Sequence, residues 1–105
     1  MSFSDNLKQL PPVTHLSALR LQDPTGAIVA TIENKPGQSG SLAVYAALAD
    51  RHGAINPAAA QEGLDLYAEH TADARAFPGK HPNIDRLLDV IASGQTLTVQ
   101  RQAAG

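Results

Sequence analysis

The sequence predicts an α+β fold in which a small three-stranded sheet, made of a β-hairpin and a C-terminal strand, is covered on one face by three helices. Two stretches of alternating polar and apolar residues flank a turn in the first third of the chain, and a third stretch lies near the C-terminus. Between them, apolar residues recur at helical spacing. With 105 residues, 43% of them apolar, the chain can bury a core without disulfides, so we expect a single domain over residues 1–105.

The composition excludes several classes of protein. The net charge is −2 and the 8 basic residues lie singly along the chain, which argues against a nucleic-acid-binding surface. The absence of cysteine excludes disulfides, thiol chemistry and cysteine-based zinc sites. The longest apolar run, residues 42–49, is far shorter than the roughly 20 residues of a membrane helix, and residues 1–12 lack the pattern of a signal peptide. We therefore expect a cytoplasmic protein that binds neither nucleic acid nor membrane.

The N-terminal segment predicts a short helix. Ser4 and Asp5 are capping residues that precede a short apolar pattern. Pro11 and Pro12 end that pattern, because proline cannot continue a helix. We expect one or two helical turns before the first strand.

A β-hairpin is predicted over residues 17–33. Leu19 and Leu21 alternate with polar residues, and the sequence 23–26 (Asp-Pro-Thr-Gly) has the residue preferences of a type I turn. The alternation resumes after the turn, as expected for the returning strand. His15 has the same strand parity as the two leucines, so we expect it to be partly buried and hydrogen-bonded.

The central helix is predicted over residues 42–52. Its surface is apolar most of the way round, which indicates a helix packed on the sheet with neighbours on both flanks. Either Ser39 or Ser41 is expected to cap its N-terminus, and Gly53 is expected to end it in the left-handed conformation.

Two further helices follow the central one. Asn56 is the expected N-cap of a helix over residues 57–74, whose interior Gly63 indicates a close approach of another helix. Asn83 is the expected cap of the third helix, which Gly94 ends. The apolar positions of that third helix follow helical spacing: Ile84, Leu87, Leu88 and Ile91.

The last strand is predicted over residues 95–101, where polar and apolar residues alternate. It is expected to return to the sheet and pair with the hairpin. A three-stranded sheet has at least one unpaired edge, and such an edge favours self-association. We therefore expect a homodimer.

Two loops carry candidate ligand-binding residues. The first, residues 35–41, combines glycines that permit close approach, a lysine, and the free N–H groups of a helix start, which together suit an anion such as phosphate. The second is the irregular loop 77–83. The alternative for the first loop is a plain strand-to-helix connection with a serine cap. The candidate residues of the two loops are Lys35, Gly37, Gly40, Ser41, Lys80 and His81.

A second group of residues suggests a metal ion or acid–base chemistry. His70 and Asp73 are three residues apart on one predicted helix face, and the following loop could bring His81 beside them. Imidazole with carboxylate suits zinc, manganese or iron. Glu69 and Asp85 flank this set. The alternative is that these acidic residues face water and that His81 lies exposed in its loop.

The remaining histidine and the tyrosines have structural explanations. His52 lies in the last turn of the central helix, where the helix dipole favours a cation. Tyr45 and Tyr67 fall on predicted core stripes, so we expect packing residues whose hydroxyl groups find hydrogen-bond partners.

Three segments carry a resemblance to a known family: residues 34–42, 69–74 and 78–87. Through them the chain resembles a small bacterial family known only as a domain of unknown function, from the hairpin to the last helix. Because no activity is assigned to that family, the resemblance implies the limits of the fold and brings no catalytic residues.

These observations lead to two hypotheses about function. The first is a non-enzymatic binding module that holds a small anion or a partner protein at one of the two loops. No cofactor is implied. The alternative is a metal-dependent enzyme that uses His70, Asp73 and His81.

Overall fold

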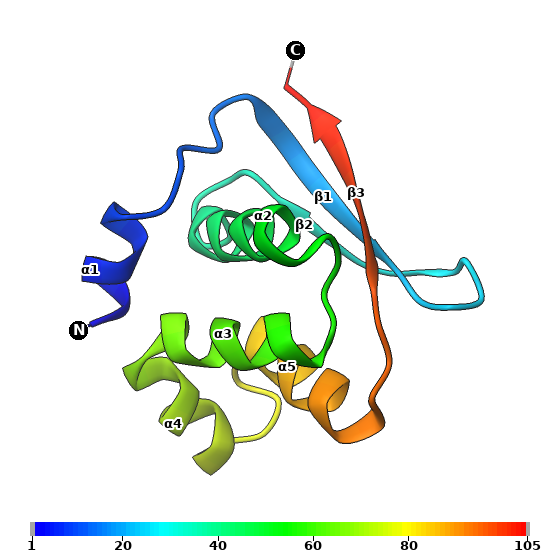
Figure 1. Ribbon diagram of the computed structural model, residues 1–105. Helices are drawn as coiled ribbons and strands as arrows, with labels where there is room; N and C mark the ends of the chain where they lie inside the picture. Colours follow the sequence, from blue (N-terminus) through cyan, green and yellow to red (C-terminus); the bar gives the residue numbers. More distant parts are fainter. Residues whose placement is uncertain (1, 105) are drawn as a thin grey trace.

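The computed structural model describes residues 2–104 and confirms the predicted α+β class (Figure 1). Its sheet has the order β2-β1-β3, with both pairs antiparallel, so the C-terminal strand pairs with the hairpin as predicted. No helix within residues 2–104 is long and apolar enough to cross a membrane. The elements are α1 (Phe3–Lys8), β1 (Leu16–Gln22), β2 (Ile28–Glu33), α2 (Ser39–His52), α3 (Pro57–Tyr67), α4 (Glu69–Ala76), α5 (Pro82–Ser93) and β3 (Thr98–Ala103).

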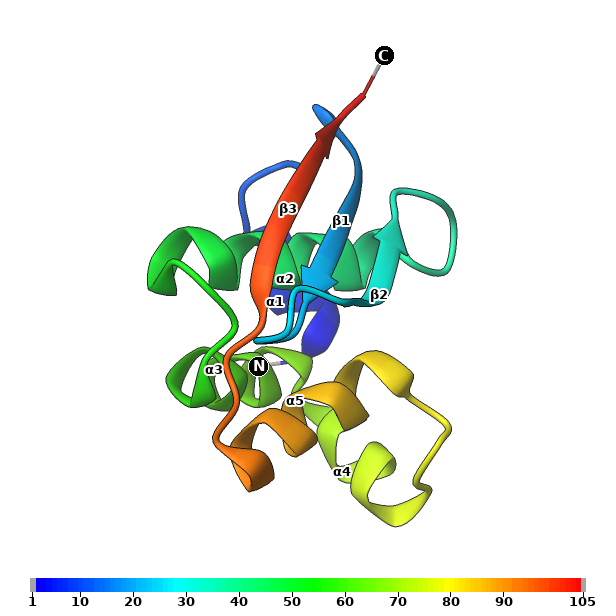
Figure 2. The same ribbon diagram turned by 90° about the vertical axis from the view of Figure 1, so that its right-hand side faces the viewer.

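The helices form two layers. Helix α2 lies against the sheet, and α3, α4 and α5 lie beyond it, on the side of α2 away from the strands (Figures 1 and 2). The short helix α1 packs against α2 and α3. The side chains of α2 that fill the core between these layers include Leu42, Val44, Tyr45 and Leu48, each fully buried, so the central position expected for this helix is confirmed.

The hairpin turn forms as predicted. The Asp23 carboxylate accepts hydrogen bonds from the Thr25 hydroxyl at 2.6 Å, the Thr25 amide at 2.9 Å and the Ala27 amide at 3.1 Å. These bonds, led by that of the Thr25 hydroxyl, hold the pKa of Asp23 below its usual value. Gly26 has a φ of 89°, which a residue with a side chain rarely adopts.

The expectation for His15 was wrong. Leu16 and Leu19 are both buried although they are three residues apart, because the pairing of β1 with β3 shifts register between Leu16 and Ala18. A bulge of this kind reverses the strand parity. His15 is consequently exposed instead of partly buried.

The start of α2 differs from the prediction. The helix begins at Ser39, and its N-cap is Gln38, which makes no side-chain capping hydrogen bond. Neither Ser39 nor Ser41 is the cap, because both lie within the first turn. The Gln38 side chain instead accepts a hydrogen bond from the Glu33 amide at 3.0 Å, which ties the helix start to β2. At the other end Gly53, with a φ of 78°, terminates the helix as predicted.

The helix predicted over residues 57–74 is in fact two helices, α3 and α4. The chain breaks at Ala68, which has a φ of 51°. Beyond the break, the Thr71 hydroxyl donates to the Leu64 carbonyl at 2.6 Å and so satisfies an acceptor at the end of α3. The predicted cap is confirmed at the other end of α3, where the Asn56 side chain accepts from the Ala59 amide at 2.8 Å.

The start of α5 also corrects the prediction. Its N-cap is His81, without a side-chain capping bond, and Pro82 is the first helical residue, a position that proline favours. Asn83 therefore lies inside the helix, where its side chain accepts from Arg86 at 2.9 Å. Gly94 ends the helix as predicted, but Val90 is buried whereas Ile91 is 38% exposed.

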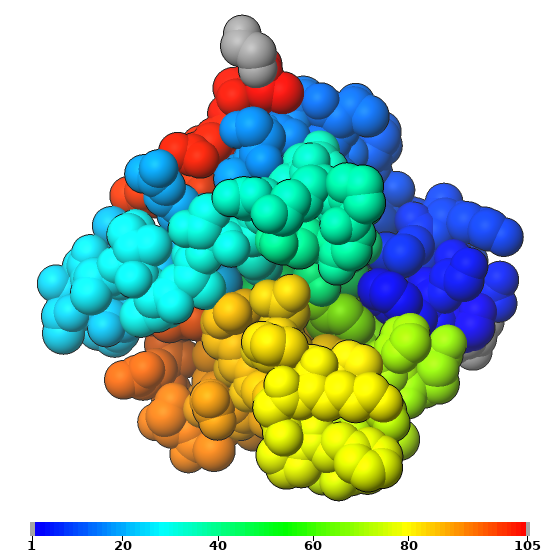
Figure 3. Space-filling model, turned by 180° about the vertical axis from the view of Figure 1, so that it is seen from behind, coloured from blue at the N-terminus to red at the C-terminus, as the bar shows by residue number. Residues whose placement is uncertain are grey.

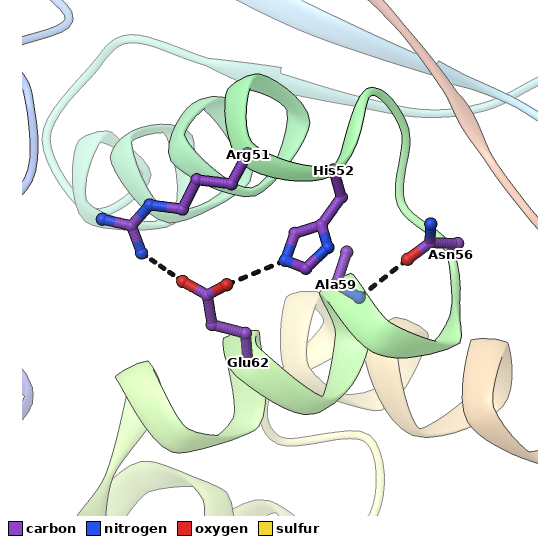
Figure 4. A network of polar contacts seen from close by, with 5 residues as sticks. All are labelled: Arg51, His52, Asn56, Ala59 and Glu62. Atoms are coloured by element: carbon purple, nitrogen blue, oxygen red, sulfur yellow. Dashed lines mark hydrogen bonds and ion pairs between the residues drawn. The ribbon is translucent and has the colours of Figure 1, made fainter.

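Helices α2 and α3 are joined by a polar cluster at the C-terminal end of α2 (Figure 4). The two carboxylate oxygens of Glu62 bind separate partners. One binds the Arg51 guanidinium, and the other lies 2.8 Å from Nε2 of the His52 ring. His52 is thus paired with a side chain of α3, in addition to its favourable place at the end of the α2 dipole. The hydrogen bond from His52, followed by that from Arg51, holds the pKa of Glu62 below its usual value.

Replacing Glu62 by glutamine should lower the stability at neutral pH by less than about 1 kcal/mol, since this pair is partly exposed. Because folding lowers the pKa of Glu62, its contribution is present above the pKa of the unfolded chain and is lost as the pH falls through the folded-state pKa. Urea denaturation at pH 7 and pH 3 should therefore show a larger difference from the wild type at pH 7 than at pH 3. Asp65→Asn, which removes an exposed carboxylate of the same helix, is the control. An equal loss of stability at both pH values would contradict the lowered pKa assigned to Glu62.

Candidate functional site

An open cleft with a volume of about 260 Å³ lies where both predicted ligand loops and α1 meet. Figure 3 shows the face of the molecule on which α1 (blue), the start of α2 (blue-green) and the 77–81 loop (yellow) come together. Chain segments that are far apart in sequence thus contribute to one surface. The residues lining the cleft are Phe3, Gly37, Ser41, Tyr67, His70, Lys80, His81, Pro82, Asn83 and Ile84.

Four of the six residues selected from the sequence line this cleft: Gly37, Ser41, Lys80 and His81. Lys35 does not, because its ammonium group lies 3.0 Å from the Glu33 carboxylate with both side chains more than half exposed. Gly40 faces α1 instead, since a Cβ atom placed on it would lie 3.4 Å from Leu7 and 3.5 Å from Phe3.

The first turns of two helices border the cleft. Gly37 lies two residues before α2 and Ser41 lies in its first turn, while His81 is the N-cap of α5 and Pro82 to Ile84 form its first turn. The amides of Gln38 and Ser39 both donate to the Lys35 carbonyl at 2.9 Å, whereas those of Gly40 and Ser41 have no acceptor among residues 2–104. A helix N-terminus carries a partial positive charge, so both helix dipoles favour an anion here.

The side chains of the cleft also favour negative charge. Three basic residues line it, His70, Lys80 and His81, and none of the lining residues within 2–104 is a carboxylate. Asp73 does not line the cleft but pairs with two of these basic residues. Its Oδ2 atom lies 2.6 Å from His81 Nε2 and 2.9 Å from Lys80 Nζ. The hydrogen bond from His81, followed by that from Lys80, holds the pKa of Asp73 below its usual value. The ionised carboxylate orients both basic groups.

The residues that the sequence suggested for a metal ion or for acid–base chemistry make contacts with different partners. Asp73 and His81 pair directly, and the rings of His70 and His81 lie 5.7 Å apart. Glu69 accepts from the Phe3 amide at 2.8 Å, and Asp85 accepts from the Gly79 amide at 2.9 Å. In the chain from residue 2 to residue 104, no group of three histidine, aspartate or glutamate side chains is arranged to hold a metal ion.

An aromatic cluster also lines the cleft, and sequence analysis missed its central member, Phe3. The Phe3 ring stacks on Tyr67, with centroids 5.1 Å apart and an interplanar angle of 20°. His70 meets Phe3 edge-on at 5.2 Å. No sequence pattern could have identified Phe3, because the residues that hold it are more than 60 positions away.

The two tyrosines are packing residues with hydrogen-bond partners, as predicted. The Tyr67 hydroxyl donates to Ser41 Oγ at 2.7 Å, and the Tyr45 hydroxyl donates to the Asn83 carbonyl while it accepts from Arg86 at 3.1 Å. Burial raises the pKa of Tyr45 to about 12 and also raises that of Tyr67. Both phenols therefore stay neutral, and their bonds fix the first turns of α2 and α5 beneath the cleft.

Fold and site together define a small α+β protein with a cleft lined by basic and aromatic side chains. The model of a family described as "Uncharacterized protein conserved in bacteria (DUF2322)" matches residues 3–101. The chain belongs to this family, which confirms the resemblance noted from the three sequence segments. Neither the curated proteins nor the solved structures contain a match to the chain.

Proposed function

We propose that this protein is a binding module for a small anion, which it holds in the cleft between the N-terminal ends of α2 and α5. The observation that carries this proposal is the convergence of two helix N-termini and three basic side chains on one open cleft. The ligand-binding residues are Gly37, Ser41, His70, Lys80 and His81. In this proposal Lys35 and Gly40, which lie outside the cleft lining, do not contact the anion.

The amide group of Ser41 is the expected donor at the α2 end, together with the Ser41 hydroxyl. That hydroxyl accepts a hydrogen bond from Tyr67, so its own hydrogen remains available to a ligand. Lys80 adds a flexible point charge, and the paired Asp73 carboxylate limits how far Lys80 and His81 can move.

Phosphate titration tests this proposal. The ¹H–¹⁵N amide signals of the lining residues Gly37, Ser41 and Asn83 should shift and saturate, with a Kd of about 1 mM or tighter for an open site of this kind. Lys80→Gln should weaken binding about fivefold, since a partly exposed charge contributes about 1 kcal/mol.

The control variant is Lys8→Gln, which removes the same charge from the end of α1, outside the cleft lining. Its phosphate affinity should equal that of the wild type. Signals that stay flat through tens of millimolar phosphate would reject the proposal, as would equal losses in both lysine variants.

The metal-dependent enzyme has less support than the binding module. Asp73 Oδ2, the carboxylate oxygen nearest to His81, is already shared between His81 and Lys80. A metal ion at that oxygen would have to displace a lysine, whose positive charge repels the ion. Elemental analysis of protein purified without a histidine tag tests this alternative, and stoichiometric zinc or manganese would revive it.

Self-association of the sheet stays a prediction, as does a location in the cytoplasm. In the β2-β1-β3 order, β2 and β3 are the outer strands, and each pairs on one side within the described chain. Either outer strand could add to the same strand of a second copy. Sedimentation at micromolar concentration measures this directly, and a monomer mass would reject the homodimer.

A further inference from the structure

We propose that the natural ligand of the cleft is a phosphomonoester whose organic part is a small planar ring, with the ring placed against Phe3. This inference rests on the proposed anion site and adds the chemical class of the ligand. It follows from three features of the cleft: its size, the presence of both basic and aromatic side chains in its lining, and the way in which Phe3 is held.

The cleft is larger than an inorganic ion requires. Its volume of about 260 Å³ equals that of roughly nine water molecules at about 30 Å³ each. Inorganic phosphate has five non-hydrogen atoms and would leave much of this space to water. A ligand that fills the cleft therefore carries an organic group beside its anionic one.

The lining combines two kinds of group that suit such a ligand. It includes the starts of α2 and α5 and the basic side chains of Lys80 and His81, and it also includes the rings of Phe3 and Tyr67. Two helix ends and several basic groups match a dianion with three acceptor oxygens better than a carboxylate with a single charge. The Phe3 ring offers a neighbour for a ring of the ligand, and aromatic pairs gain from stacked or edge-on contact.

Phe3 is held in place before any ligand arrives. Its amide donates to Glu69 at 2.8 Å, and its ring is fixed by Tyr67 and His70. Asn6 of the same short helix donates to the Leu66 carbonyl at 2.9 Å, which anchors α1 on the end of α3. A side chain that is already ordered loses little conformational entropy on binding, so its contact favours the ligand.

Three probes test the inference on the wild-type protein: inorganic phosphate, glycerol 3-phosphate and phenyl phosphate. Phenyl phosphate should bind about tenfold more tightly than either of the others, a difference of about 1.4 kcal/mol. Phenyl protons should show intermolecular NOEs to the Phe3 ring. If all three probes bind equally, or if the NOEs reach only residues outside the cleft, the inference is wrong although the anion site stands. If no probe binds, the proposed function fails as well.

A matched pair of variants separates the ring contact from the phosphate contact. Phe3→Leu should reduce the preference for phenyl phosphate over phosphate to about twofold while phosphate affinity is kept. Phe77→Leu alters the other phenylalanine, which is 57% exposed and does not line the cleft. Its ring centroid lies 5.2 Å from Lys80 Nζ, but Lys80 acts on the phosphate group that both probes share, so the tenfold preference should persist. Because the readout is a ratio of affinities within one variant, a small change in overall fold affects both probes alike. A preference that survives Phe3→Leu would overturn the assignment of Phe3.

Discussion

Leu48→Ala should destabilise the protein by about 2 to 5 kcal/mol, the range for removing a fully buried leucine. Leu48 lies in the middle of α2 with no exposed surface, in the helix that separates the sheet from α3 and α5. The substitution removes apolar contacts and leaves a cavity that the two helical layers cannot easily close. Urea denaturation followed by circular dichroism measures the loss.

Ile91→Ala is the matched control, because this isoleucine of α5 is 38% exposed. Its cost should stay within about 1 kcal/mol, since less apolar surface returns to water and alanine is the better helix former. A loss below about 0.5 kcal/mol for Leu48→Ala would show that α2 does not occupy the core.

Gly63→Val should cost about 3 kcal/mol, toward the upper end of overpacking effects. A Cβ atom on Gly63 would lie 2.6 Å from Leu87 Cδ1 and 2.9 Å from Leu48 Cδ1, closer than van der Waals contact allows. Both leucines are fully buried, so neither can turn away without disturbing the core. The close approach of α5 to α3 is the physical reason for a glycine in the middle of α3, as its position in the sequence indicated.

A double-mutant cycle separates this steric effect from helix propensity. Gly63→Ala alone combines the clash with a propensity gain of about 1 kcal/mol. In the Leu87→Ala background the nearest atom is gone, so the same substitution should be at least about 0.5 kcal/mol less costly than in the wild type. Additive effects would mean that Gly63 and Leu87 do not touch. Denaturation of the four proteins under one condition provides the cycle.

Signals contained in short stretches of sequence predicted their structures well. The 23–26 turn, the Asn56 cap, and the helix ends at Gly53 and Gly94 are all confirmed. Each depends on the backbone preferences of one residue or on hydrogen bonds between residues a few positions apart. The apolar surface of α2 likewise indicated its burial before any neighbour was known.

Boundaries that depend on distant contacts were missed. Alanine is a strong helix former, so nothing in the local sequence marks the break at Ala68, where the chain turns so that α4 can pack beside α5. Serine is a common cap, yet Ser41 lies inside α2 because its hydroxyl is the partner of Tyr67, a residue 26 positions away. In each case a tertiary contact outweighed a local preference of about 1 kcal/mol.

By itself the sequence determined the α+β class, the hairpin and the central helix, together with four residues that line the cleft, because turn chemistry, periodicity and glycine-rich helix starts are local properties. Only the tertiary structure brought the starts of α2 and α5 to one cleft and placed Phe3 against Tyr67 and His70 there. In the folded protein the Lys35 ammonium group also forms an ion pair with the Glu33 carboxylate, and Gly40 faces α1. These outcomes depend on how the helical layers stack, which is decided by the summed burial of many side chains and is not encoded in any single segment.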